Sequence, residues 1–461
     1  MRRWLAWNVA FRLQEWAKGH ETFRQLREME AADRLSAEGL QELQARRLQA
    51  LVCSCYQHVP YIRQRMDKAG VRPEQIRTAA DLAQLPVFTK ADFREHRADL
   101  RSDQATRLSQ FTTGGSTGEP LIFDLGRRRV ASRVACRQRV ARWWGVSVGN
   151  REIALWGSPI EVTRQDWIRR ARDRMLRTRL LSAFEMSAST ITQYLDFFEA
   201  NGCDQMFGYP SALYLFCLQA NREKRDLRRC GVKVVFVTGE VLFPHQRAFI
   251  SETLDCPVAD GYGGRDSGFI AHECPSGGMH ILSDVVIAEI VDPSGRPIAA
   301  GEAGQIVITD LFSEEAPFIR YATGDYGVAS SRRCACGRAL PLLERIEGRS
   351  NDLVITPDGR VINSLALVYP LRGIDGIEQY RIVQKALDTF HVQLTCSRTF
   401  DRLSEERIRA GWQQLFRAPL HITFEYLFRI PPDPRGKFRH IVSELSAGHA
   451  VAPAAHNGRG Q

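Results

Sequence analysis

The sequence lacks any apolar run that approaches the roughly 18–20 residues a membrane-spanning helix needs. It also lacks the apolar core of a signal peptide, because the basic residues 1–7 are followed by Asn8, Arg12, Gln14 and Glu15. These absences argue against an integral membrane protein and against a secreted one. We therefore expect a cytoplasmic protein.

A disulfide framework is not expected either. The chain has eleven Cys, an odd number, and no signal segment, which favours reduced thiols. The net charge of +10 is unevenly placed, with seven Arg in each of the segments 127–142 and 164–179. Each run is interpreted as a solvated helix face or as a docking surface for an acidic partner, such as a phosphorylated cofactor or a carrier protein. Aromatic residues are not interleaved with the Arg runs, so nucleic acid is not an expected partner.

The N-terminal residues 1–70 are predicted to be helical. Trp4, Trp7, Phe11 and Trp16 are spaced roughly as one helix face. Packing onto the body of the protein is the favoured role of this face. Peripheral contact with a membrane surface is the alternative, because Trp and Arg together are typical of interfacial helices.

A chain of 461 residues is too long for one ordinary core. Strands and helices alternate from the strand at 121–123 to the strand at 257–262, which predicts parallel α/β layers. One of the helices in this part is expected at 164–181, and residues 278–348 are rich in β-strand patterns. The fold class is therefore α/β. We expect a large multi-layer domain over 1–350, a small α+β domain over 351–446 and a disordered tail over 447–461.

Residues 111–120 combine three glycines with four hydroxyl side chains. Glycines let backbone N–H groups approach an anion closely, and hydroxyls add donors for phosphate oxygens. The stretch lacks the Lys and the spacing of a Walker loop, and it is not a dinucleotide fingerprint. Alone it is interpreted as a flexible surface loop, so its function depends on partners elsewhere in the chain.

Further motifs follow this loop, and each of them is short. They are, in order, Gly208-Tyr209-Pro210-Ser211, Thr238-Gly239-Glu240, Gly261-Tyr262-Gly263-Gly264-Arg265-Asp266, Tyr321-Ala322-Thr323-Gly324-Asp325, Gly348-Arg349-Ser350-Asn351-Asp352 and Gly436-Lys437. In this order and spacing the series resembles the adenylate-forming, acyl-CoA synthetase-like enzymes. It is most similar to their phenylacetate–CoA ligase and capsule-biosynthesis-ligase-like branch, over about residues 50–445.

The resemblance implies a two-step reaction of ATP with a small-molecule carboxylic acid. The carboxylate attacks the α-phosphorus to give an acyl-adenylate and pyrophosphate, and a thiol then displaces AMP. CoA is the expected acceptor, with Mg²⁺ as a cofactor. The alternatives are an acyl carrier protein, a sugar or amine in envelope polysaccharide biosynthesis, or a non-catalytic ATP- and zinc-binding module. A homodimer is also expected.

The resemblance also implies the residues that bind ATP. The β- and γ-phosphates would lie against Thr113, Gly114, Gly115, Ser116, Thr117 and Gly118. The adenine would be framed by Gly239, Glu240, Gly261, Tyr262 and Gly263, with Tyr262 stacking on the base. Asp325 would accept both ribose hydroxyls, and Arg349 would reach the ribose or a phosphate.

Three further positions are implied to serve the chemistry. Lys437 would stabilise the charge that develops between the carboxylate and the α-phosphate. Asn351 would be the hinge about which a mobile C-terminal domain turns, removing Lys437 and admitting the acceptor. Asp266 would hold Mg²⁺.

This sequence departs from the family pattern at two positions. Arg265-Asp266 replaces the usual Thr-Glu, so that the presumed Mg²⁺ ligand is one methylene shorter. Glu119 replaces the Lys that usually follows the glycine-rich loop, which removes a cation near the phosphates. Arg265 is the proposed replacement for that cation.

A second group of residues predicts a structural zinc site. Cys274 and His280 are followed by Cys334 and Cys336, and thiolates and imidazoles in tight turns suit tetrahedral Zn²⁺. His272 is an alternative fourth ligand, and ordinary free thiols are the competing interpretation. Similar Cys/His sets occur in the resembled branch. The acyl pocket is not defined by the sequence, although Trp156, Phe184, Tyr209 and Tyr262 are candidates for an aromatic wall.

Overall fold

The structure is a computed structural model that describes residues 2–113, 121–156, 167–183 and 186–349. In the C-terminal part it describes residues 353–358, 361–363, 367, 369–371, 374, 376–396, 400–428, 430 and 441–445. The chain divides into two compact units, residues 1–346 and 347–461. Among the described residues, no helix combines the length and apolar character needed to cross a membrane.

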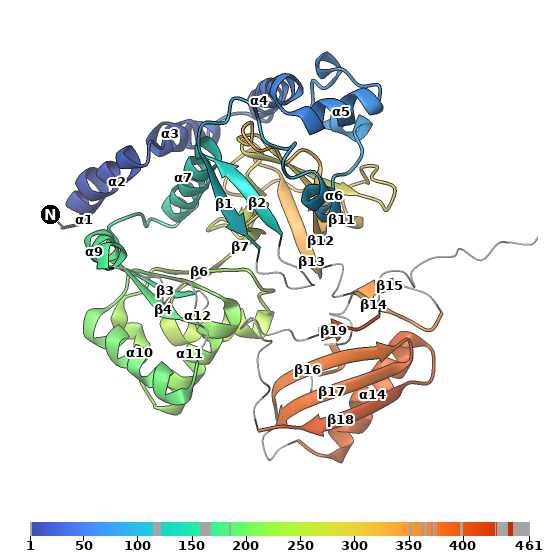
Figure 1. Cartoon of the computed structure of the whole chain (residues 1–461). Helices are drawn as coiled ribbons and strands as arrows, with labels where there is room; N and C mark the ends of the chain where they lie inside the picture. Colours follow the sequence, from blue (N-terminus) through green and yellow to red (C-terminus); the bar gives the residue numbers. More distant parts are fainter. Residues whose placement is uncertain are drawn as a thin grey trace, which may run out of the picture. The chain divides into compact units, whose positions relative to one another are not determined.

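The first unit begins with helices, as the sequence predicted (Figure 1). They are α1 Arg2–Leu5, the π-helix η1 Ala6–Phe11, α2 Arg12–Ala17, α3 Thr22–Ala32, α4 Ala37–His58 and α5 Pro60–Lys68. Two 3-10 turns follow, η2 Pro73–Gln75 and η3 Ala79–Gln84, and then α6 Lys90–Glu95. A capping box starts α6: the Thr89 hydroxyl accepts from the backbone N–H of Asp92, and the Asp92 carboxylate accepts from the Thr89 N–H in return.

An 11-stranded sheet is the framework of the first unit, in the order β10-β11-β12-β13-β9-β8-β7-β6-β5-β3-β4. Its parallel half contains β3 Glu152–Trp156, β4 Thr178–Ser182, β5 Gln205–Gly208, β6 Val234–Thr238 and β7 Val258–Gly264. The helices between them are α9 Trp167–Leu176, α10 Ala188–Asn201, α11 Pro210–Arg222, the short η4 Leu227–Cys230 and α12 Pro244–Leu254. The predicted alternation of strands and helices is confirmed.

One predicted helix is too long. Residues 164–181 were expected to form a single helix, but α9 ends at Leu176 and residues 178–182 form β4. Arg177 has a positive φ of 62°, which ends the helix. The next residues pair in parallel with β3, from Thr178 opposite Glu152 to Ser182 opposite Trp156. The sequence pattern did not reveal this boundary, because Arg residues continue from the helix into the strand.

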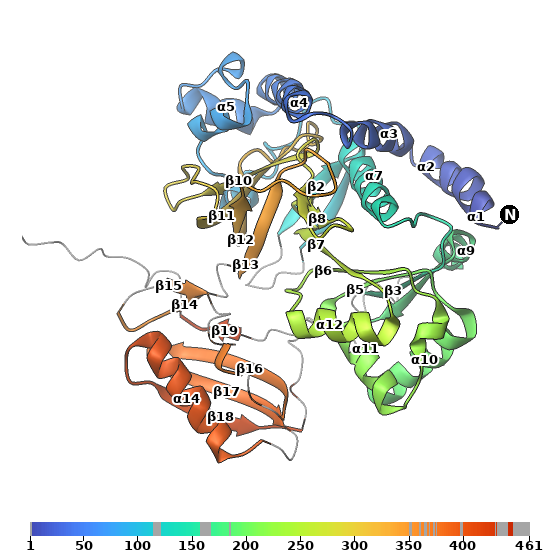
Figure 2. The ribbon, with the colours of Figure 1, turned by 180° about the vertical axis from the view of Figure 1, so that it is seen from behind.

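The two faces of the parallel half are covered by different helices. Successive strand residues point to opposite faces, so Val235 and Val237 of β6 pack with residues of α10, α11 and α12. Val234 and Phe236 pack on the other side with Ala141 of α7 Arg127–Trp143. Figure 2 shows α10, α11 and α12 gathered beside these strands.

The β-rich part continues the same sheet. It contains β8 Gly268–Glu273, β9 Met279–Ile281, β10 Val286–Val291, β11 Ala303–Asp310, β12 Tyr321–Ser330 and β13 Leu342–Arg349. β7 and β8 are antiparallel, and so are β8–β9, β10–β11 and β11–β12. A separate antiparallel hairpin joins β1 Leu108–Thr112 to β2 Ile122–Gly126.

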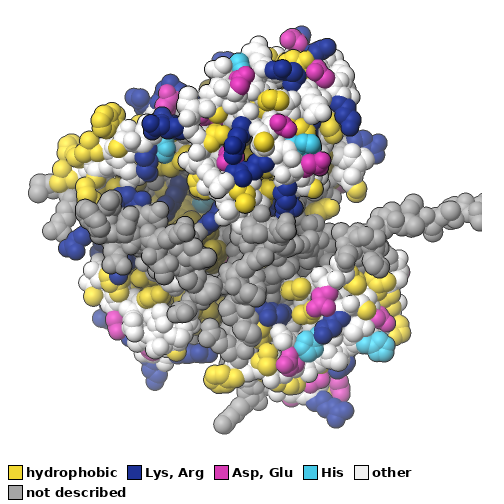
Figure 3. Space-filling view, viewed as in Figure 1, with side chains coloured by type: hydrophobic (Ala, Val, Ile, Leu, Met, Phe, Trp, Pro, Cys, Tyr) yellow, Lys and Arg dark blue, Asp and Glu magenta, His cyan; other side chains and the backbone are white. Residues whose placement is uncertain are grey.

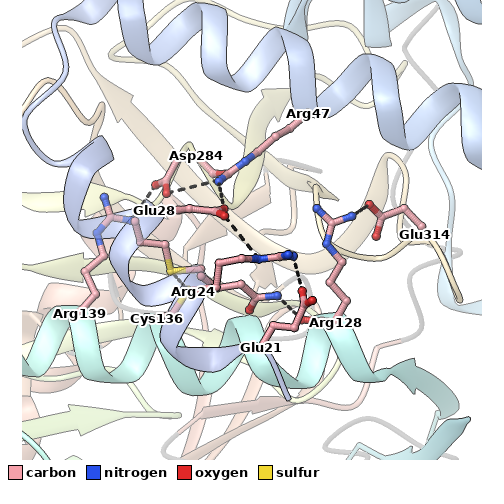
Figure 4. Close-up of polar contacts among 11 residues, drawn as sticks. Glu21, Arg24, Glu28, Arg47, Arg128, Cys136, Arg139, Asp284 and Glu314 are labelled. Atoms are coloured by element: carbon pink, nitrogen blue, oxygen red, sulfur yellow. Dashed lines mark hydrogen bonds and ion pairs between the residues drawn. The ribbon is translucent and has the colours of Figure 1, made fainter. Parts of the chain in front are cut away.

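Two Arg of the Arg-rich helix α7 are buried in ion pairs, which corrects the prediction of a solvated or docking surface for Arg129 and Arg139. Arg128 and Arg137 of the same run are 44% and 42% exposed. Arg139 is fully buried and donates to Asp33 (2.8 Å) and Asp284 (2.7 Å), while Arg129 is buried against Asp310 (2.6 Å). Figure 4 shows Arg139 and Arg47 meeting at Asp284. Three further Arg pair as Arg128–Glu314, Arg137–Glu152 and Arg142–Glu30, and Arg133 donates to the Asp266 carbonyl. The carboxylates come from distant segments, so the sequence pattern of α7 alone does not reveal them.

The second unit has its own core. Its sheet has the order β18-β17-β16-β19, with β16 Ile377–Ala386, β17 Thr389–Cys396, β18 His421–Tyr426 and β19 Ile441–Ser443. Trp412 of α14 Arg402–Phe416 is buried against Phe390, with ring centroids 5.5 Å apart. A hairpin of β14 Leu353–Ile355 and β15 Val361–Asn363 and the turn η6 Tyr369–Leu371 complete the described part. The α+β character predicted for this region is present.

Candidate active site

The glycine-rich segment lies in the β1–β2 hairpin. At the end of the hairpin, the Thr113 N–H donates to the Leu121 carbonyl and the Leu121 N–H donates to the Thr113 hydroxyl, both over 2.9 Å. Thr113 therefore fixes the two ends of the segment against each other. The predicted phosphate-binding residues Gly114, Gly115, Ser116, Thr117 and Gly118, and the neighbouring Glu119, lie outside the described residues.

Predicted residues also follow the carboxyl ends of β5 and β6, where ligands of parallel sheets bind. Tyr209 follows β5, and its ring stacks on Trp156 at the end of β3 with centroids 4.1 Å apart. Gly239 follows β6 with φ 82°, and a Cβ there would lie 3.1 Å from the Tyr209 ring. The Glu240 carboxylate accepts from the N–H of Ser211 at the start of α11, over 3.1 Å. Gly239 is thus needed for both its backbone angle and its close approach to an aromatic ring.

The burial of Tyr209 changes its acidity. Burial raises the pKa of the Tyr209 hydroxyl to about 12, and the nearby Glu240 carboxylate adds to this rise. The side chain therefore stays neutral at physiological pH. Trp156 and Tyr209, two of the candidates for an aromatic wall, thus stack on each other where β3 and β5 end. Phe184, another candidate, lies outside the described residues.

Tyr262 and Asp325 are brought together from strands β7 and β12. The Tyr262 hydroxyl donates to the Asp325 carboxylate over 2.9 Å and lies 3.5 Å from the Thr323 hydroxyl, to which the Asp325 N–H also donates. Gly263 has no room for a side chain, since a Cβ would lie 2.1 Å from the Gly268 carbonyl. At Gly261 a Cβ would lie 2.8 Å from the His272 ring. Glycine is therefore needed on both sides of Tyr262, because β8 lies too close to β7 there for a side chain.

Asp266 is buried in the turn between β7 and β8, and its surroundings were not predicted. Its carboxylate accepts from the Tyr321 hydroxyl (2.6 Å) and from the Ser267 N–H (3.0 Å). Its carbonyl accepts from Arg129 (2.5 Å) and Arg133 (3.2 Å) of α7. Tyr321 belonged to a predicted motif without a role of its own, and no local signal connects it to a residue 55 positions away.

Arg265 precedes Asp266 and points toward the hairpin. Its guanidinium lies 3.5 Å from the Thr112 carbonyl at the end of β1, where the glycine-rich segment begins. Burial lowers the pKa of Arg265 from its ordinary value. Arg265 therefore lies beside the described start of the glycine-rich segment.

The remaining predicted residues belong to the C-terminal part of the chain. Arg349 is the last residue of β13, and its side chain lies outside what the structure describes. Asn351 and Lys437 also lie outside the described residues. Their roles stay predictions.

A cavity of about 430 Å³ lies between α7 and the sheet. Its wall includes Arg133 and Arg137 of α7, Phe207 of β5, Phe236 of β6, and Phe269 and His272 of β8. His272 is buried, which lowers its pKa and favours the neutral imidazole. The wall thus combines aromatic rings with many polar and charged side chains, among them Glu152 and Asp173.

The four predicted zinc ligands lie close together, and the alternative ligand His272 is not among them. Their ligand atoms in Cys274, His280, Cys334 and Cys336 all lie within 4.8 Å of one another. The Cys274 and Cys334 sulfurs are 3.5 Å apart, too far for a disulfide, and His280 Nε2 is 3.1 Å from the Cys336 sulfur. Three sulfurs and one imidazole nitrogen match the donor set of a closed tetrahedral zinc site.

The surroundings of this Cys/His cluster orient its ligands. His280 Nδ1 lies 3.1 Å from the Leu340 carbonyl, which turns Nε2 toward the sulfurs. A Cβ at Gly278 would lie 2.6 Å from the Cys334 sulfur, so the turn after Cys274 requires glycine there. Burial raises the pKa of Cys274 to about 11. At Cys336, hydrogen bonds from Arg338 outweigh burial, and the pKa is lowered.

Comparison with known proteins relates the whole chain to one group of enzymes. The chain is 25% identical over 397 residues to the phenylacetate–coenzyme A ligase of Thermus thermophilus, covering 82% of this chain and 87% of the relative. It is 20% identical over 375 residues to protein CapK of Staphylococcus aureus, covering 80% and 81%. Residues 354–444 match the CapK C-terminal domain family. The chain is a homologue of the phenylacetate–CoA ligases and of CapK.

Solved structures agree on the fold. The structure of 2-hydroxyisobutyryl-CoA ligase in the postadenylation state, in complex with R3-HIB-AMP, matches with a TM-score of 0.73 at 21% identity, covering 90% of this chain and 91% of that chain. The same ligase in the thioesterification state, with 2-HIB-AMP and CoA, matches with a TM-score of 0.61 at 22% identity, covering 89% and 91%. This chain, a homologue of the phenylacetate–CoA ligases and of CapK, therefore has the fold of the adenylate-forming ligases, including the C-terminal domain.

Proposed function

We propose that this chain is an ATP-dependent ligase that activates a carboxylic acid as an acyl-adenylate and then transfers the acyl group to a thiol. The contact between Tyr262 and Asp325 carries the proposal, because it joins the predicted adenine and ribose residues at 2.9 Å. Homology to phenylacetate–CoA ligases over four fifths of the chain supports it. CoA is the proposed acceptor.

Adenylation requires several negative groups to be brought together. Thr113 and the glycine-rich segment up to Gly118 would bind the β- and γ-phosphates through backbone and hydroxyl donors. Gly239, Glu240 and Tyr262 would frame the adenine, and Asp325 would hold the ribose hydroxyls. Arg349 would assist at the ribose or a phosphate. Lys437 would approach the carboxylate and the α-phosphate as they react.

Asp266 is the proposed ligand of Mg²⁺. Each of its carboxylate oxygens accepts one protein hydrogen bond, so lone pairs remain for a metal. When bound, Mg²⁺ would offset phosphate charge during adenylation. Tyr321 and the Arg129 and Arg133 contacts to the Asp266 carbonyl hold this residue in place. Arg265, near the start of the phosphate loop, would supply the cation that Glu119 does not.

The Cys/His cluster is proposed to bind a structural zinc ion. All four positions are taken by protein side chains, which leaves no place for a substrate on the metal. The ion would join the turn after β8 to the segment before β13. It would hold the β-rich part of the sheet together.

The alternative functions differ in the molecule that accepts the acyl group. The relation to CapK favours a second possibility, transfer to a carrier protein or to a sugar or amine in envelope polysaccharide biosynthesis. A non-catalytic module that binds ATP and zinc is the third. A cytoplasmic location and a homodimer remain parts of the proposal.

Exchange of labelled pyrophosphate into ATP tests the first step. Across a panel of carboxylic acids, at least one acid should support exchange, and Lys437→Ala should abolish it while ATP still binds. Product analysis with CoA, a carrier protein and amines would then identify the acceptor. ATP binding without exchange or AMP release would establish the non-catalytic alternative and refute the ligase.

A further inference from the structure

The N-terminal helical segment formed by α1, η1 and α2 exposes large apolar side chains. Trp4 is 62%, Leu5 44%, Val9 40%, Leu13 58% and Trp16 79% exposed. Figure 3 shows hydrophobic side chains gathered over these helices, at the left of the view. Contiguous apolar surface of this kind marks a place where another surface binds.

Four of these residues form one stripe. Leu5, Val9, Leu13 and Trp16 follow one another at intervals of four, four and three residues, which places them on one face of a helix. We call these four residues the exposed stripe. Met175 of α9, a helix that packs against η1, is a further exposed apolar side chain, at 59%.

The opposite face holds the segment on the first unit. The rings of Trp7 and Phe11 each pack against Phe23 of α3 with centroids 5.3 Å apart. The buried Glu15 carboxylate accepts from the Thr22 hydroxyl over 2.5 Å. The exposed stripe is therefore presented outward by a packed helix and is not a product of fraying.

Cations accompany the stripe. Arg3 and Arg12 are exposed, and Arg12 neighbours Val9 and Trp16 on the helix surface. Arg12 lies 5.0 Å from the Phe23 ring, and Arg3 donates to the Ser147 hydroxyl over 3.4 Å. Among the residues that the structure describes, neither guanidinium forms an ion pair with a carboxylate. The net charge of the chain is +10.

We propose that the exposed stripe binds the surface of an anionic membrane. Leu, Val and Trp side chains would enter the boundary between headgroups and acyl chains, and Arg12 and Arg3 would meet lipid phosphates. Trp at both ends of the segment suits this boundary, where an apolar ring and a polar N–H are both accommodated. A two-fold pairing of two stripes would instead bring the Arg12 cations of both copies together. The membrane is therefore the favoured partner, and the inference does not depend on the catalytic proposal.

Sedimentation of the full chain with vesicles tests the proposal. We expect binding to phosphatidylcholine vesicles that contain phosphatidylglycerol, and much weaker binding to phosphatidylcholine alone. High salt should weaken the binding by screening. The double variant Leu13→Glu/Trp16→Glu should lower the partition coefficient at least about tenfold, since it places charge in the apolar boundary. Arg12→Gln should reduce the preference for the anionic vesicles.

Matched controls lie on α14 of the second unit. Leu403 is 61% exposed and Arg402 is an exposed cation, so Leu403→Glu and Arg402→Gln should leave vesicle binding unchanged. The proposal is overturned if the wild-type chain does not sediment with anionic vesicles, or if the double variant binds as well as the wild type. Light scattering provides the other decisive result. A wild-type dimer that the double variant converts to a monomer, without vesicle binding, would assign the stripe to a second copy of the chain.

Discussion

At the residue scale, single contacts position the groups that the sequence nominated. The Tyr262 hydroxyl and the Asp325 carboxylate meet at 2.9 Å although they come from different strands. This hydrogen bond orients the carboxylate proposed to hold the ribose, and the tyrosine ring is the group proposed to stack on the base. The ring and the hydroxyl therefore have separable roles.

Substitutions at this pair should separate the two roles. Tyr262→Phe removes one hydrogen bond, worth about 0.5–1.5 kcal/mol, and should raise the KM for ATP about two- to tenfold. Asp325→Ala removes a charged acceptor, worth about 1.5–3 kcal/mol in hydrogen bonding, and should have the larger effect. Steady-state kinetics of AMP formation measures both. As a control, Tyr56→Phe deletes the hydroxyl that bonds Asp67 at 2.8 Å and should leave the KM unchanged.

Zinc content is a second test at this scale. The purified wild-type chain should contain about one zinc ion, and Cys274→Ser should lose it together with thermal stability. Gly278→Ala should also weaken binding, because its Cβ would lie 2.6 Å from the Cys334 sulfur. Elemental analysis measures the metal, with Cys53→Ser as a matched thiol substitution outside the cluster. If the wild-type chain contains no zinc after expression in zinc-supplemented medium, the proposed zinc site is wrong.

At the scale of elements, buried ion pairs hold α7 in the fold, although its Arg-rich sequence predicts a helix at the surface. Its guanidiniums at Arg129 and Arg139 are fully buried, and their carboxylate partners lie on other segments of the first unit. The strands β1 and β4 were likewise missed, because each depends on a partner strand, and the predicted strand at 121–123 was found as the partner of β1. Pairing across a sheet is non-local, whereas the local helical pattern of residues 1–70 and the local strand pattern of 257–262 match the helices and strand β7 found there.

Two Arg substitutions should differ strongly in cost. Arg139→Met leaves Asp33 and Asp284 without their shared partner, and should lower the free energy of unfolding by about 3–5 kcal/mol. Arg24 pairs with Glu21 and Glu28 at the surface, so Arg24→Gln should cost less than about 1 kcal/mol. Urea unfolding of each variant measures the difference. Equal costs would mean that the α7 pairs are no more important than surface pairs.

The buried Glu15 connects α2 to α3 and predicts a pH dependence. Burial raises its pKa, but hydrogen bonds from His20 and Thr22 and the Lys18 charge outweigh burial and lower the pKa to about 2 from 4.5. Because the folded-state value is the lower one, its stabilisation is present above pH 4.5 and is lost as the pH falls toward 2. Glu15→Gln should therefore be less stable than wild type at pH 7, and the difference should shrink in acid. A difference independent of pH would contradict this role.

At the scale of the whole molecule, the chain consists of two compact units with separate cores. The first carries the glycine-rich segment, Tyr262, Asp266 and Asp325, and the second includes the region of Lys437. If Asn351 is the hinge, a substitution there should affect the two half-reactions differently. Asn351→Pro fixes φ near −65° and should slow thioester formation while pyrophosphate exchange persists.

The hinge test needs both half-reactions measured on the same preparation. Asn351→Ala is the control, since alanine leaves the backbone dihedrals free and should preserve both steps. Equal loss of both steps in Asn351→Pro would indicate a folding defect. Unchanged thioester formation in Asn351→Pro would contradict the hinge at this residue.

The sequence by itself determined the alternation of strands and helices, the motif series and the four zinc-ligand candidates. These features are local: hydrophobic period, glycines that permit tight turns, and ligands in short turns. Only the tertiary structure decided that Tyr321 and two Arg of α7 hold Asp266, and that His280 and not His272 joins the cysteines. It likewise decided that Arg129 and Arg139 of α7 are buried. It also decided that the N-terminal segment buries Phe11 and half-buries Trp7 while leaving Leu13 and Trp16 exposed. Each of these depends on contacts between distant segments, which fix the direction of a side chain and which no local pattern records.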